Sequence, residues 1–416
     1  MTEKNKPKVF YGYIIVMVAI GIHIVGWGVF STFGVFFDSF LNEFGWTRAT
    51  ISGAASLAYL ALGFNTIIVG RLSDRFGPRI VMTGCGLFLG LGYLLMSRIG
   101  AIWQLYLFYG VVVAVGSSGL DVLPLSTVAR WFTKRRGIMS GILKVGSGIG
   151  ILIMPLTASW LILGYGWRTS YLILGSVALA VIIVAAQFLR RDPSQKGLTA
   201  YGADKANANN SNAEEVGFTL QQAIHLRQLW LLCTMCVLIF FCINTVVIHI
   251  VTYGVTMGFP RTSAASILAV LGGVSMIGRI VMGGVGDRIS SRLAITICFP
   301  IIAVALFWLQ IAGELWMLYL FAVVYGFAHG GFFALLAPLV AELFGLKTHG
   351  AIFGIVFFSG TAGGSLGSVL VGHIFDITGS YQLGFLICAL LAVTSFIIAL
   401  WLRPTGSKAL QSAGGI

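Results

Sequence analysis

The stretch Gly70-Arg71-Leu72-Ser73-Asp74-Arg75-Phe76-Gly77-Pro78-Arg79 lies between two apolar runs, and a second copy occurs later in the chain. That copy reads Gly283-Gly284-Val285-Gly286-Asp287-Arg288-Ile289-Ser290-Ser291-Arg292. Both keep a glycine, an aspartate and an arginine at the same spacing. This pattern predicts a tight turn beside an acid that can pair with basic groups on neighbouring helix ends. The repeat indicates two related halves, and it predicts a gating motif made of Gly70, Asp74, Arg75, Asp287 and Arg288.

The composition around this repeat is that of a membrane protein. Of 416 residues, 58% are hydrophobic and 9% are charged, and the mean hydropathy is +0.95. A water-soluble domain cannot bury so much apolar surface, so a lipid bilayer must be the solvent. The net charge of +13 would suggest nucleic acid in a soluble protein, but here the basic residues form short patches between apolar runs. The composition therefore argues against a nucleic-acid partner.

The apolar runs predict an all-α membrane protein, because a spanning helix needs about 20 mostly apolar residues. We expect twelve transmembrane helices in two halves of six, residues 1–189 and 229–416, joined by a cytoplasmic linker at 190–228. The predicted spans are roughly 11–36, 47–69, 80–96, 103–128, 137–163, 169–188, 229–256, 264–282, 293–311, 315–339, 351–375 and 383–401.

Charge placement predicts the orientation. Most of the 26 lysines and arginines fall in the loops on the side of the N-terminus, which places both termini in the cytoplasm and the protein in the cytoplasmic (inner) cell membrane. The first apolar run is too long for a signal peptide, so we expect it to stay as a span. The linker contains the polar tract 207–212, which cannot fold alone. Its end, 218–229, is predicted as either a short interfacial helix or a solvated loop.

The repeated motif resembles the inner-loop motif of the major facilitator superfamily, and the first copy matches it at Gly70, Leu72, Asp74, Arg75, Gly77 and Arg79. The second copy departs at Ser290. The resemblance covers nearly the whole chain and implies the fold of that superfamily. Residues 131–150 also resemble the signature of the monocarboxylate transporter family, at Lys134, Arg135, Arg136, Gly141, Gly146 and Gly150. The first-span motif of that family survives only as Tyr11-Gly12-Tyr13, so oxalate/formate-type carriers remain an alternative.

Arg279 is the sharpest candidate for a binding residue. A charge at bilayer depth costs at least about 2.5–3.5 kcal/mol, so such a residue should face the interior and have a partner. A guanidinium fits a carboxylate through two parallel hydrogen bonds. In the monocarboxylate transporters an arginine of the eighth span pairs with the substrate carboxylate, and the resemblance implies this role for Arg279. That family has an aspartate one turn earlier, where this chain has Ser275. The alternative is a structural arginine that binds helix carbonyls.

Two other charges, Asp121 and Lys144, fall at similar depths in the fourth and fifth spans, so a pair between them is possible. The pair is either a structural salt bridge or a functional one that opens when Lys144 meets an anion or Asp121 takes a proton. Polar residues near the middle of other spans are candidates for substrate binding. These are Asn244, Tyr325 and His329, and His329 is also a candidate for carrying a proton.

Three functions fit this pattern. The first is proton-coupled symport, by alternating access, of a monocarboxylate such as lactate, pyruvate or acetate, because the single unpaired cation Arg279 suits one negative charge. The second is an oxalate/formate-type organic anion exchanger, and the third is a membrane sensor that does not transport. The sequence has no phosphate-binding loop, hydrolase pattern or metal-ligand pattern, which predicts no enzyme, no cofactor and no metal. The need for an accessory subunit stays open.

Overall fold

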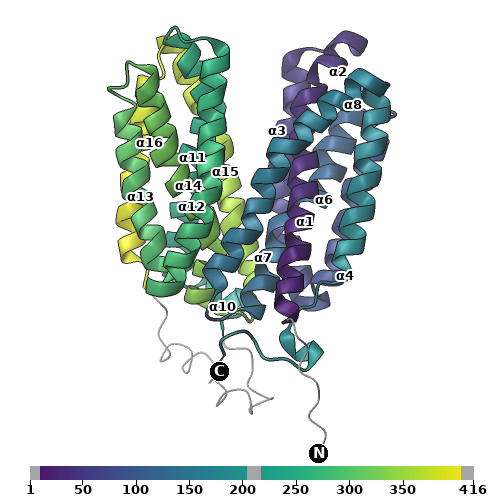
Figure 1. The fold of residues 1–416 in the computed structure, drawn as a ribbon, viewed down its shortest axis with the longest axis vertical. Helices are drawn as coiled ribbons and strands as arrows, with labels where there is room; N and C mark the ends of the chain where they lie inside the picture. The colour runs from purple at the N-terminus through teal and green to yellow at the C-terminus, as the bar shows by residue number, and fades with distance from the viewer. Residues whose placement is uncertain (1–9, 204–216, 404–416) are drawn as a thin grey trace, which may run out of the picture.

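The computed structural model describes residues 10–203 and 217–403, and nearly all of these are helical (Figure 1). Within this part, eleven helices are long and apolar enough to cross a membrane. One of them, α8 (Arg136–Ala186), is interrupted at Gly166, where φ is 77° and ψ is 160°. Because α8 therefore holds two spans, the prediction of twelve transmembrane helices is confirmed. Residues 1–9, 204–216 and 404–416, which include the polar tract 207–212 of the linker, lie outside the described residues.

The first half contains the spans that precede the linker. They are α1 (Tyr11–Ser31), which continues through η1 (Thr32–Phe36) into α2 (Phe37–Phe44); α3 (Arg48–Phe76); α4 (Pro78–Met96); α5 (Ile102–Leu105) with η2 (Tyr106–Val113), α6 (Ala114–Ser117) and α7 (Gly119–Trp131); and α8.

The second half repeats this arrangement after the linker. The linker carries the short helices η3 (Pro193–Lys196) and α10 (Leu220–Ile224). The spans are α11 (Arg227–Thr256), α12 (Arg261–Ile289), α13 (Ser291–Trp308), α14 (Leu315–Phe344), α15 (His349–Thr378) and α16 (Gln382–Trp401).

The halves meet at one end of the molecule and separate at the other. Figure 1 shows α3, α7, α8, α12 and α15 converging near the linker, while the opposite tips of the two halves diverge. We call these the linker end and the open end. Glycines allow the convergence, since a Cβ on Gly350 of α15 would lie only 2.8 Å from the carbonyl oxygen of Gly70 in α3. The repeated motif therefore lies where the two halves touch.

The end of the linker folds onto the second half. Of the two alternatives predicted for 218–229, the helix is present as α10, and Thr219 and Gln222 form a capping box at its start. The solvated loop was wrong, because Phe218, Leu220 and Ala223 are buried.

Candidate functional site

A buried ion pair joins α7 to α8. Lys144 Nζ donates to Asp121 Oδ1 over 2.7 Å, and the two side chains are 6% and 2% exposed. Trp27 Nε1 of α1 donates to the same oxygen at 3.3 Å, and His23 Nε2 lies 3.7 Å from it. Asp121 Oδ2 has no hydrogen-bond partner among the described residues. The pair that the sequence made possible is formed, and one carboxylate oxygen is left to accept a proton.

Arg279 reaches this pair from the second half of the chain. Its Nη1 donates to the main-chain carbonyl of Lys144 and, at 3.2 Å, to Ser147 Oγ. Gly148 makes room for it, because a Cβ there would lie 3.2 Å from Nη1. In the described part of the chain no carboxylate lies within 4.0 Å of this guanidinium, and its Nε has no hydrogen-bond partner. Arg279 is thus anchored by a helix carbonyl and keeps a donor that an anion can use.

A cavity of about 240 Å³ lies between the two halves and reaches all three of these charges. Asn244, His329 and Thr361 add polar groups to its wall. The rest of the wall is largely aromatic, from Trp27, Tyr59, Phe240, Phe333 and Phe357. This is a small, mostly apolar site with a few converging polar groups, the form expected of a site for a small molecule.

The predicted binding residues do not all meet in this cavity. Arg279, Lys144, Asn244 and His329 line it. Tyr325 does not, because it is fully buried with its ring 5.0 Å from Phe321 and 6.1 Å from His329, centroid to centroid.

The two aspartates of the repeated motif form a matched pair of contacts at the linker end. Asp74 accepts hydrogen bonds from the backbone N–H groups of Gly350 and Ala351, at 3.2 and 2.9 Å. Asp287 accepts from those of Gly137 and Ile138, at 2.6 and 2.9 Å. Each carboxylate therefore binds the N-terminus of a helix in the opposite half, where the helix dipole favours an anion.

This geometry bears on the prediction that the motif acids pair with basic groups on neighbouring helix ends. Arg130, in the last turn of α7, forms an ion pair with Asp74 at 3.6 Å. The hydrogen bonds to both acids come from backbone N–H groups. Arg75 and Arg288 are both exposed at the surface. The arginines of the motif therefore do not join this contact.

Two side chains at the linker end were missed from the sequence. Arg130 of α7 donates from Nη2 to the carbonyl of Leu346 over 2.6 Å, which links the two halves. His349 at the start of α15 is fully buried, with Nδ1 3.0 Å from Ser126 Oγ and Nε2 3.0 Å from the carbonyl of Ala337. A lone histidine in a loop sequence gives no signal of such contacts.

The linker is anchored at both of its ends. In the first half, Tyr201 N donates to the carbonyl of Trp131 over 2.9 Å, and Tyr201 O accepts from Thr133 N at 3.0 Å. In the second half, Phe218 N donates to the carbonyl of Phe344 over 2.9 Å, and the Thr348 hydroxyl donates to Phe218 O over 2.9 Å. The two anchors use loops in equivalent places of the two halves, before α8 and before α15.

Comparison with known proteins shows which family and which solved structures this chain resembles. A family model described as the Major Facilitator Superfamily matches residues 16–312 and 280–415. Monocarboxylate transporter 13 of Rattus norvegicus is 28% identical over 403 residues, which cover 95% of this chain and 90% of that protein. The uncharacterized MFS-type transporter YhjX of Escherichia coli is 25% identical over 360 residues, with 85% of each chain covered. A crystal structure of FucP from E. coli in the outward conformation has a TM-score of 0.73 at 17% identity, covering 95% of this chain and 100% of that one.

Proposed function

This chain belongs to the Major Facilitator Superfamily, as a membrane transporter related to the monocarboxylate transporters and not an enzyme, and from that premise we propose that it carries small monocarboxylates together with protons. The substrates are acids of the lactate, pyruvate or acetate type, moved by alternating access. We further propose that the linker end faces the cytoplasm, as the placement of basic residues favours. In that orientation the open end faces outward and the cavity is reached from outside.

The charge of the cavity carries this proposal. It is lined by two cations, Lys144 and Arg279, and by one carboxylate, Asp121. Because Lys144 is already paired with Asp121 over 2.7 Å, the excess positive charge belongs to Arg279. A single buried cation without a carboxylate suits a substrate with a single negative charge.

The same geometry suggests how a proton is coupled to the anion. Protonation of Asp121 neutralises the partner of Lys144, so the ammonium is released toward the cavity. The substrate carboxylate then binds between Lys144 and Arg279 and shields both charges during the change of access. His23, 3.7 Å from Asp121, and His329 on the cavity wall are further groups that can hold the proton. After release of the acid, Asp121 loses its proton and pairs with Lys144 again.

The contacts at the linker end supply the alternating step. Asp74 and Asp287 hold the helix N-termini of the opposite halves, so both sets of hydrogen bonds must break before the cavity opens to the cytoplasm. Substrate binding pulls the two halves together around Arg279 and Lys144, which compensates for that loss.

Uptake by proteoliposomes tests the proposal. Purified protein is first screened for thermal stabilisation by lactate, pyruvate, acetate, formate and oxalate, and the acids that bind are then offered with an inward proton gradient. We expect accumulation that a protonophore abolishes and that membrane voltage leaves unchanged, because a proton and a monoanion together carry no charge. Voltage-dependent uptake would instead favour the anion exchanger. Binding without any uptake would favour the sensor.

A further inference from the structure

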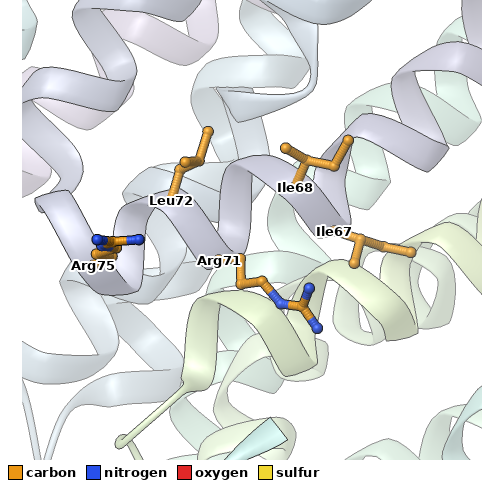
Figure 2. Close-up of a pocket in the computed structure, with 5 residues that line it drawn as sticks. All are labelled: Ile67, Ile68, Arg71, Leu72 and Arg75. Atoms are coloured by element: carbon orange, nitrogen blue, oxygen red, sulfur yellow. The ribbon is translucent and has the colours of Figure 1, made fainter.

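A shallow depression of about 210 Å³ lies on the outer surface of α3, near its linker end, and is separate from the central cavity. It is lined by Ile67, Ile68, Arg71, Leu72 and Arg75, which occupy two to three successive turns of the same helix. Figure 2 shows these side chains spread along α3, with Arg71 extending toward the yellow-green helix α15. The wall of the depression is almost entirely apolar, and two of its five lining residues are arginines.

Among the described residues, Arg71 and Arg75 have no acidic partner. Arg71 and Arg75 are exposed, and in the described ranges neither forms an ion pair or a hydrogen bond; Arg75 only lies over the ring of Phe76 at 5.1 Å. Residues four apart on a helix are neighbours, so the two like charges repel each other. Asp74, the nearest acid in sequence, is directed to Gly350 and Ala351. Within residues 10–203 and 217–403 the two positive charges are therefore not compensated, and an anionic ligand would neutralise them.

The internal repeat separates Arg71 from the gating role of the motif. Asp74 and Asp287 make equivalent contacts in the two halves. At the place of Arg71, however, the second copy has Gly284. Because the contact of Asp287 forms without an arginine there, the gate does not need one. Arg71 is an addition to the first copy.

The position of Arg71 and Arg75 along α3 indicates which kind of anion would bind. α3 ends at Phe76, so Arg75 lies in its last turn and Arg71 one turn, roughly 6 Å, deeper. Ile67 and Ile68 lie one turn deeper still, and Ile68 and Leu72 are 44% and 40% exposed. Arginine forks match phosphate oxygens, and basic pockets at the membrane surface bind anionic lipid head groups. We propose that this depression binds an anionic phospholipid, with Arg71 and Arg75 on its phosphate and Ile67, Ile68 and Leu72 against its acyl chains.

The site is tested by lipid binding rather than by transport, so its failure and that of the proposed substrate are distinguishable. The purified full-length protein is titrated with spin-labelled phosphatidylglycerol or phosphatidylcholine, and the apparent affinities are compared for the unmodified chain and for Arg71→Gln. The matched control is Arg48→Gln, which removes an exposed arginine from the opposite end of the same helix. We expect phosphatidylglycerol to bind more tightly than phosphatidylcholine. Arg71→Gln should weaken phosphatidylglycerol roughly tenfold, as the loss of a charge-assisted hydrogen bond does, and Arg48→Gln should not.

Each other outcome contradicts the site. Equal affinity for the two lipids, or an Arg71→Gln variant that binds phosphatidylglycerol as before, overturns it. If inorganic phosphate displaces phosphatidylglycerol at equal concentration, the depression is a phosphate site and not a lipid site. Because the Arg71 side chain is exposed and makes no hydrogen bond in the described structure, the variant should fold, and an unchanged melting temperature in phosphatidylcholine verifies this.

Discussion

Removing the charge of Asp74 should shift the equilibrium between the two access states. Its carboxylate accepts two backbone N–H groups at the start of α15, at 3.2 and 2.9 Å. Asp74→Asn keeps one acceptor oxygen but loses the charge and one hydrogen bond. A hydrogen bond to a charged group contributes about 1.5–3 kcal/mol, so the closed linker end should lose roughly ten- to hundredfold in population relative to the open one.

Distances between spin labels at the open end measure this shift. Arg48→Cys and Arg261→Cys place labels at the starts of α3 and α12, in opposite halves, and the six native cysteines are buried and therefore protected from labelling. In Asp74→Asn the open end should close more often, so the label-to-label distance distribution should gain a shorter component. Asp38→Asn is the control, because it removes an exposed acid of α2.

Kinetics provide a second readout of the same change. The contact at Asp74 is remote from the cavity, so Asp74→Asn should lower the turnover rate more than it changes the substrate KM. The double variant Asp74→Asn/Asp287→Asn removes both matched contacts. If its distance distribution equals that of the unmodified protein, the two aspartates do not hold the linker end closed and the reasoning fails.

Three further changes probe the site and the gate. Arg279→Lys keeps the charge but loses the fork, so gradient-driven uptake should fall at least about tenfold, and near-normal uptake would leave Arg279 a structural role. Asp121→Asn should abolish accumulation driven by a proton gradient yet retain substrate exchange, measured in preloaded proteoliposomes; a fall in folding yield with no selective loss of coupling would mean that Asp121 only neutralises Lys144. His349→Ala leaves the Ser126 hydroxyl and the Ala337 carbonyl unpaired, so it should destabilise the protein by about 1–3 kcal/mol in thermal unfolding, and an unchanged melting temperature would contradict those contacts.

The fold was predictable because its signals are local. Span length, hydropathy and the repeated motif depend on neighbouring residues only, and the rise of an α-helix was enough to bring Asp121 and Lys144 to the same depth. Gly166 also acted locally, since its positive φ ends one span and starts the next.

Contacts between the halves were not predictable, because no local pattern specifies which helix end lies opposite an acid. The hydrogen-bond donors to Asp74 are backbone N–H groups of α15, and every residue except proline has such a group. The place of Tyr325 was not predictable for another reason. Tyr325 lies one turn from His329 on α14, yet His329 lines the cavity, whereas the ring of Tyr325 packs against Phe321. Spacing along the helix alone does not distinguish these two positions. The Tyr325 hydroxyl is buried and has no hydrogen-bond partner among the described residues. No polar partner elsewhere in the sequence could therefore have indicated that this side chain is buried.

Because each end of the linker is anchored to its own half, we expect that the chain can be divided into two polypeptides. Tyr201 pairs with the backbone beside Trp131, and Phe218 pairs with the backbone beside Phe344, so each linker end contacts only its own half in these hydrogen bonds. Covalent continuity between the two anchors is then dispensable for the position of either. Two separate polypeptides, 1–203 and 217–416, would each retain their own anchor. Co-expressed, they should assemble into one complex that takes up substrate, which would make the transporter a two-piece system whose halves can be labelled, exchanged or supplied separately.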